Sequence, residues 1–67
     1  MTDIQILDAL IEQAGGVKPF SAVMGVSRQS VWEWRTRITD SARIRMFLRA
    51  EEIGLRLPKD FLKRALA

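Results

Sequence analysis

The feature that most restricts the fold of this chain is one glycine, Gly25, between two short stretches of helical character. Apolar side chains recur at helical spacing over residues 20–24, and Val31 and Trp34 repeat three residues apart after the glycine. Ser27 stands where its hydroxyl can accept an amide proton from the first turn of a helix. Gly25 can adopt a positive φ at no steric cost, as a tight turn between helices requires. The segment therefore predicts two helices joined by a sharp turn.

The first of these two helices is preceded by another helical stretch. Thr2 and Gln5 have the spacing of a capping box, which places a helix start at the N-terminal end. Two consecutive glycines at 15–16 end that helix, because glycine accepts the left-handed conformation common at helix C-termini. Pro19 then suits the first turn of the next helix. The helix after Gly25 is predicted over residues 27–38.

The C-terminal part predicts one or two more helices. A polar break at 39–41 contains three possible N-caps, and a helix with a broad apolar surface follows it to about Gly54. Its apolar residues are Ile44, Met46, Phe47, Leu48, Ala50 and Ile53. A short extended segment is expected near Leu55 to Leu57, since the residue before Pro58 avoids the helical region, and Pro58 can start a last short helix. The fold class is therefore all-α, a small bundle of four to five short helices forming one domain over residues 1–67.

Composition excludes several classes of site. The 67 residues include no cysteine and no histidine, so disulfides and the usual zinc sites are not expected. The chain has no glycine-rich phosphate loop, and no acid pair lies in a recognisable pocket motif, so we expect neither an enzyme nor a bound metal or cofactor. The start of the chain does not resemble a signal peptide, and no apolar run is long enough to cross a bilayer. These features predict a cytoplasmic protein.

Charge is distributed unevenly along the chain. Residues 1–17 carry three acids and no base, whereas residues 18–67 carry eleven bases and five acids, giving net charges of −3 and +6. Such asymmetry favours a surface that meets a polyanion. An ordinary solvated surface would explain the charge alone equally well.

The turn and its flanking residues resemble a known family. Met24-Gly25-Val26-Ser27, Val31 and Trp34 match the helix-turn-helix pattern of phage Cro-type repressors and the related YdaS-like regulators, and the glycine pair at 15–16 resembles the link before that family's second helix. The chain departs from the pattern at Phe20-Ser21, where Leu-Ala is usual. Serine is small enough to preserve a close helix crossing, and Val26 is expected to fill the space beneath the turn. The resemblance covers about half the chain, up to Arg37, and leaves residues 41–67 unplaced.

The resemblance implies a transcriptional regulator, most simply a repressor, that binds double-stranded DNA in the major groove through the helix at 27–38. If Val31, Trp34 and Ile38 face the core, five outward residues become candidate base contacts: Ser27, Arg28, Gln29, Trp32 and Glu33. Arginine pairs with guanine and glutamine with adenine, although either side chain could contact phosphate instead. Glu33 could accept from cytosine or orient Arg37 across one helical turn. Trp32 could contact DNA or lie flat against its own domain.

Phosphate contacts are expected from basic residues on and around the helices before and after Gly25. The candidates are Lys18, Arg35, Arg37, Arg43 and Arg45. Individually, each could equally be solubilising surface charge.

The last third of the chain has more apolar side chains than it can easily bury. Because small helix-turn-helix proteins usually bind DNA in pairs, we expect a homodimer interface that includes Leu55, Leu57, Phe61 and Leu66. The same residues could simply complete the single core. The main rival function is a protein-interaction module, such as an antitoxin or antirepressor, that uses this apolar surface. A basic helix lying on a membrane is a weaker reading, because its apolar residues are needed for the core.

Overall fold

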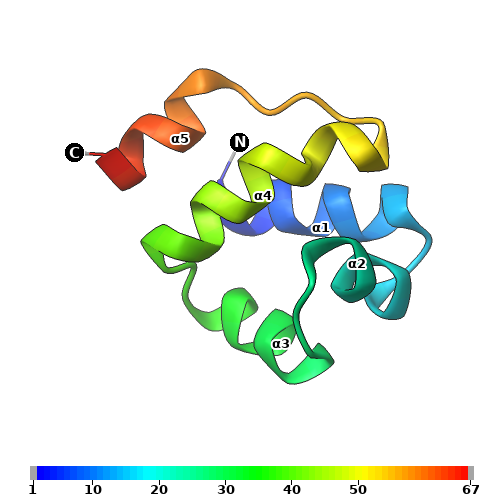
Figure 1. Cartoon of the computed structure of the whole chain (residues 1–67). Helices are drawn as coiled ribbons and strands as arrows, with labels where there is room; N and C mark the ends of the chain where they lie inside the picture. The colour runs from blue at the N-terminus through cyan, green and yellow to red at the C-terminus, as the bar shows by residue number, and fades with distance from the viewer. Residues whose placement is uncertain (1, 67) are drawn as a thin grey trace.

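The computed structural model describes the backbone of residues 2–66 and the side chains of residues 2–63. Five helices follow one another: α1 (Asp3–Ala14), α2 (Val17–Met24), α3 (Arg28–Thr36), α4 (Asp40–Ile53) and α5 (Lys59–Leu66). Residues 2–66 contain no strand, which confirms the predicted all-α class. None of the described helices is long and apolar enough to cross a membrane. Figure 1 shows α4 crossing in front of α1, with α2 and α3 on one side of this pair and the 55–58 segment on the other.

The predicted boundaries of α1 are confirmed. Thr2 and Gln5 form the complete capping box, in which the Thr2 hydroxyl accepts from the Gln5 amide and the Gln5 side chain accepts from the Thr2 amide. At the other end Gly15 has a φ of 100°, and its amide donates to carbonyls of the last turn. The helix buries Ile6, Leu7 and Leu10 against the rest of the bundle.

The glycine turn has the expected geometry. Gly25 has a φ of 70° and ψ of 33°, the left-handed conformation that an L side chain rarely adopts. Its amide and that of Val26 donate to carbonyls near the end of α2, which closes the turn. Ser27 is the N-cap of α3, and its hydroxyl accepts from the Ser30 amide at 3.2 Å. Two consecutive helices are thereby held by a turn of only three residues.

The predicted end of α3 is wrong by two residues. The helix ends at Thr36, and Arg37 already has the extended angles φ −155° and ψ 126°. Ile38 lies outside the helix, yet it is partly buried against the core. An apolar residue at helical spacing can therefore reach the core from the loop that follows a helix.

The core lies where α1, α2, α3 and α4 meet, and Phe61 of α5 completes it. Phe20 and Met24 from α2 are fully buried, as is Val31 from α3. The rings of Phe20 and Trp34 meet edge to face, with centroids 6.2 Å apart and planes at 87°. Such pairs contribute about 0.5–1.5 kcal/mol beyond the burial of their area. The helix-turn-helix unit is thus fixed by packing as well as by its turn.

The inward face of α4 differs from the predicted one. Thr39 caps the helix, and Ala42, Met46, Ala50 and Ile53 face inward. The sequence predicted Leu48 on the broad apolar surface of this helix, but 69% of its surface is exposed. Its helix carries apolar residues on nearly every side, so periodicity alone did not select the buried face.

The last helix begins one residue after Pro58. Residues 55–58 form neither helix nor strand, and Leu55 and Leu57 are partly buried against the core. Phe61 is fully buried in the core, so its predicted role at a dimer interface is wrong. The side chain of Leu66 lies outside the described residues, and its predicted interface role therefore stays a prediction.

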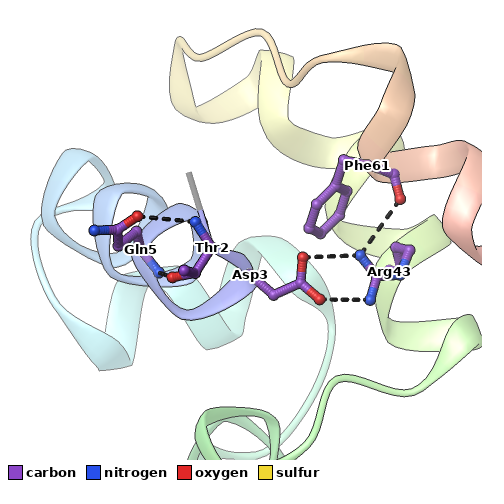
Figure 2. A network of polar contacts seen from close by, with 5 residues as sticks. All are labelled: Thr2, Asp3, Gln5, Arg43 and Phe61. Carbon is purple, nitrogen blue, oxygen red and sulfur yellow. Dashed lines mark hydrogen bonds and ion pairs between the residues drawn. The ribbon is translucent and has the colours of Figure 1, made fainter.

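A buried arginine connects the first, fourth and last helices (Figure 2). The guanidinium of Arg43 donates to both carboxylate oxygens of Asp3, at 3.1 and 2.6 Å, and to the carbonyl oxygen of Phe61 at 3.4 Å. It also lies 4.7 Å from the centroid of the Phe61 ring. The hydrogen bonds that Arg43 donates to Asp3 raise the pKa of Arg43, against an opposing effect of burial. Arg43 is therefore a positive charge held inside the fold by its carboxylate partner.

Candidate nucleic-acid interface

The first two turns of α3 present a row of polar and aromatic side chains to solvent. Arg28, Gln29 and Glu33 are exposed, and Trp32 has 55% of its surface exposed. On the opposite side of the same helix Val31 and Trp34 are buried, as the spacing predicted. The exposure of Trp32 argues against the alternative that its ring lies flat against its own domain.

The side chains of this row are not used by the fold. Within the described part of the chain, Arg28, Gln29 and Trp32 make no side-chain hydrogen bond, ion pair or ring contact. The expected orienting pair between Glu33 and Arg37 is not formed among these residues either; their link is a backbone hydrogen bond of 2.9 Å from the Arg37 amide to the Glu33 carbonyl. All four α3 side chains are therefore available to a ligand.

Ser27 has a different position from the other predicted base contacts. Its hydroxyl is exposed but accepts from the Ser30 amide, and it lies 3.3 Å from the Ser30 hydroxyl. An N-cap hydroxyl satisfies an amide that would otherwise have no partner. Ser27 is the N-cap of α3. Any contact of its hydroxyl with a ligand would be made by an oxygen that already accepts a hydrogen bond from the Ser30 amide.

Three residues set the angle between α2 and α3. Ser21 is buried, and its hydroxyl donates to the Lys18 carbonyl at 2.8 Å, which satisfies its polar group inside its own helix. Val26 is partly buried beneath the turn and packs against the core. A β-carbon added at Gly25 would lie 3.4 Å from a guanidinium nitrogen of Arg45. This is an ordinary contact with the end of a flexible side chain, so the positive φ of Gly25, rather than crowding, disfavours a larger residue there.

Two arginines of α4 reach the end of α2. Arg45 donates to the Met24 carbonyl at 2.8 Å, and Arg49 donates to the Val23 carbonyl at 3.1 Å. These carbonyls belong to the last turn of α2, where a helix lacks backbone partners and favours positive charge. Sequence reasoning missed Arg49, because only the crossing of α2 and α4 brings it to this turn. Both arginines remain exposed.

The predicted phosphate contacts divide into three groups. Lys18 and Arg37 are exposed, and no hydrogen bond or ion pair engages their side chains within the described residues. Arg45 is exposed, but its guanidinium donates to the Met24 carbonyl beside the turn. Arg35 is ion-paired with Asp8 of α1. The prediction for Arg43 is wrong: the side chain is only 9% exposed and is paired with Asp3, so it cannot reach a phosphate in this fold.

Two of the four predicted dimer residues, Leu55 and Leu57, line a small, mainly apolar hollow of about 130 Å³. Arg56 and Pro58 of the same segment and two residues of α1, Ile6 and Ala9, complete its lining. The 55–58 segment lies on the opposite side of the molecule from α3 (Figure 1). This hollow is therefore remote from the outward face of α3.

The comparisons with known proteins leave the site to be interpreted from its own geometry. No protein-family model, curated protein or solved structure gave a significant match to this chain. The likeness to Cro-type and YdaS-like regulators accordingly depends on the residues around Gly25. Among the described residues no group of three or more acidic side chains is placed to hold a metal ion.

Proposed function

We propose that this chain binds double-stranded DNA in a sequence-dependent way and acts as a transcriptional regulator. The first turns of α3 enter the major groove, and a second copy of the chain occupies the other half of the site. One observation carries the proposal: Arg28, Gln29 and Trp32 stand exposed and unengaged on a helix whose opposite face is locked into the core. The Cro-type resemblance supports repression as the outcome of binding.

The chemistry of this face suits base edges. The Arg28 guanidinium can donate two hydrogen bonds to guanine, and the Gln29 amide can both donate to and accept from adenine. Each such pair discriminates by about 1–3 kcal/mol against the wrong base. Trp32 offers an apolar surface to a thymine methyl or a sugar. Glu33 can accept from a cytosine amino group, since no arginine of the described chain occupies its carboxylate.

Phosphate contacts complete the proposed interface. Of the predicted phosphate contacts, Lys18 and Arg37 are exposed without a partner side chain among the described residues, and Arg45 adds charge near the turn. Gly16 gives α2 no side-chain cap, and Pro19 has no amide hydrogen, so the Val17 and Lys18 amides are those that the start of α2 can offer to an anion. With a few such contacts, the logarithm of affinity falls by about 0.9 per neutralised phosphate for each unit of log salt.

The test begins with duplexes selected by the full chain from a random-sequence pool. Fluorescence anisotropy then measures their affinity at several salt concentrations for the native chain, Arg28→Ala and Gln29→Ala. Each substitution should weaken binding to the selected duplex by about 5- to 100-fold and relax preference at one base position. Lys18→Ala should weaken all duplexes alike and make the salt slope shallower by about one unit.

Matched controls lie away from α3. Arg56→Ala removes the same charge as Arg28→Ala from the opposite side of the molecule, and Gln13→Ala removes an exposed amide near the end of α1. Both controls should keep the base preference of the native chain. If Arg28→Ala and Gln29→Ala also keep it, α3 does not read the bases and the proposed recognition mode is wrong.

The rival function, a protein-interaction module, predicts a different salt dependence. An interface based on apolar burial around Leu55 and Leu57 would change little in affinity between low and moderate salt, whereas phosphate contacts would weaken steeply. Failure to enrich any duplex from the pool, together with salt-insensitive capture of a polypeptide, would favour that alternative over DNA binding.

A further inference from the structure

One arginine of α3 is paired with an acid of the same chain. The Arg35 guanidinium donates a hydrogen bond to the Asp8 carboxylate of α1, and the two side chains form an ion pair. Within the described residues, no other ion pair or side-chain hydrogen bond joins α3 to another helix. Arg28, at the start of the same helix, has no such partner there. The chain therefore supplies its own anion to one basic residue of the candidate interface.

The position of Arg35 on α3 matters for DNA binding. Arg35 follows Arg28 by seven residues, so the two lie on the same flank of the helix, about 20° apart around its axis. Along the axis they are about 10 Å apart. A helix in the major groove, which is about 12 Å wide, has a phosphate strand on each side. If α3 enters the groove as proposed, Arg35 on its flank faces one of these strands.

The ion pair is too exposed to hold the fold together. The side chains of Arg35 and Asp8 are 40% and 47% exposed, and exposed pairs contribute little to stability. Burial of Val31 and Trp34 anchors α3 instead. Asp8 can therefore leave Arg35 while the helix stays in place. A phosphate can then take its position, because a guanidinium binds carboxylate and phosphate oxygens in the same way.

We infer that the Asp8 carboxylate restrains DNA binding by competing with a backbone phosphate for the Arg35 guanidinium. The inference rests on the proposed function and describes an intramolecular control of that same interface. In the free chain, Asp8 already neutralises Arg35. When a phosphate approaches, Asp8 either stays beside it, and the two anions repel each other, or turns into water, and the ion pair is lost. Both alternatives lower the affinity.

This restraint acts on every duplex alike. Phosphate contacts position a protein on DNA but carry no sequence information. Asp8 should therefore lower the affinity for selected and unselected duplexes by the same factor. It should also make the salt dependence shallower, because each phosphate that the protein neutralises contributes about 0.9 to the slope of log affinity against log salt.

Fluorescence anisotropy of the full chain tests the inference on two duplexes, the selected one and a scrambled one of equal composition. Asp8→Asn retains the size of the side chain and an oxygen that accepts from Arg35, but lacks the charge. It should tighten binding to both duplexes by about 3- to 10-fold and steepen the salt slope by up to about 0.9. Asp8→Glu restores the charge and should bind as the native chain does.

Two controls separate competition at Arg35 from a general change in charge. Glu12→Gln removes the same charge one turn further along α1, where the exposed Glu12 has no partner side chain among the described residues. Because salt screens distant charges, it should change the affinity by less than about 2-fold. In an Arg35→Ala background, Asp8→Asn should also change the affinity by less than about 2-fold, since no guanidinium remains to be released.

Several outcomes would overturn the inference. Unchanged affinity in Asp8→Asn would show that Asp8 does not compete with phosphate, and weaker binding would show that it orients Arg35 toward the DNA. A gain that Glu12→Gln or the Arg35→Ala background reproduces would be a general effect of charge. A changed ratio between the two duplexes would mean that α3 itself has moved. In each case the native chain still prefers its selected duplex, so the proposed function stands. If neither the native chain nor Asp8→Asn binds any duplex, the proposed function fails and this inference fails with it.

Discussion

The ion pair between Asp3 and Arg43 provides a sharp test of the packing described here. We expect Asp3→Ala to destabilise the fold strongly, because it leaves a buried guanidinium without its carboxylate. The Arg43 side chain is 9% exposed and that of Asp3 is 27% exposed. Removing one member of a buried pair costs about 3–5 kcal/mol. Because Asp3 keeps some contact with water, we expect a loss below that range, about 2–3 kcal/mol.

This magnitude includes a smaller effect at the start of α1. Asp3 is the acid in the first turn of that helix, where a negative charge contributes about 0.3–1 kcal/mol. The Nε of Arg43 is buried without a hydrogen-bond partner among the described residues, so the native pair is itself imperfectly satisfied. For a domain of this size, a loss of 2–3 kcal/mol corresponds to a fall in Tm of about 10–20 °C.

Urea and thermal unfolding followed by circular dichroism measure the effect. Asp8→Ala is the matched control: it also removes an acid of α1 from an ion pair, but Arg35 and Asp8 are 40% and 47% exposed. An exposed pair contributes less than about 1 kcal/mol. Combining Asp3→Ala with Arg43→Met should recover at least about 1 kcal/mol, since no buried charge then remains. Equal losses for Asp3→Ala and Asp8→Ala would refute the reasoning that burial decides the difference.

Three further predictions concern the helix-turn-helix unit. Gly25→Ala should lower the free energy of unfolding by about 1–2 kcal/mol in urea titrations, because alanine is strained at a φ of 70°; an unchanged midpoint would contradict the strained turn. Ser27→Ala should cost about 1 kcal/mol through loss of the α3 cap, whereas Ser27→Asp should retain most of the stability. Acrylamide should quench the fluorescence of Trp32 much more than that of Trp34, as measured on Trp34→Phe and Trp32→Phe respectively; similar quenching in both would show that Trp32 is not exposed as described.

Local signals in the sequence predicted most of the secondary structure. The Thr2 and Ser27 caps and the glycines at 15 and 25 act through neighbouring residues, and each appears in the structure at its expected position. The burial of Val31 and Trp34 followed from helical spacing for the same reason. Such features depend on a few consecutive residues, so they can be recognised before the fold is known.

The errors concern contacts that form only when helices pack. Arg43 was expected on the surface because arginine usually is, but its helix position lies beside Met46 and Ala50, which face inward. Its partner Asp3 is 40 residues away in the sequence. Leu48 was expected inside because apolar residues surround α4, and only the packing of α1, α2 and α5 against this helix determines which of them are covered. Arg49 belongs to the same class, since its contact with α2 has no local signature.

The separation of roles within α3 has an evolutionary consequence. The residues that anchor this helix, Val31, Trp34 and the Ser27 cap, are distinct from Arg28, Gln29 and Trp32. Under the proposed function, mutations at the latter positions would alter what the molecule recognises while leaving its thermodynamic stability nearly unchanged. Under that function, substitutions at these positions can change the recognised target one at a time, and each intermediate variant still folds.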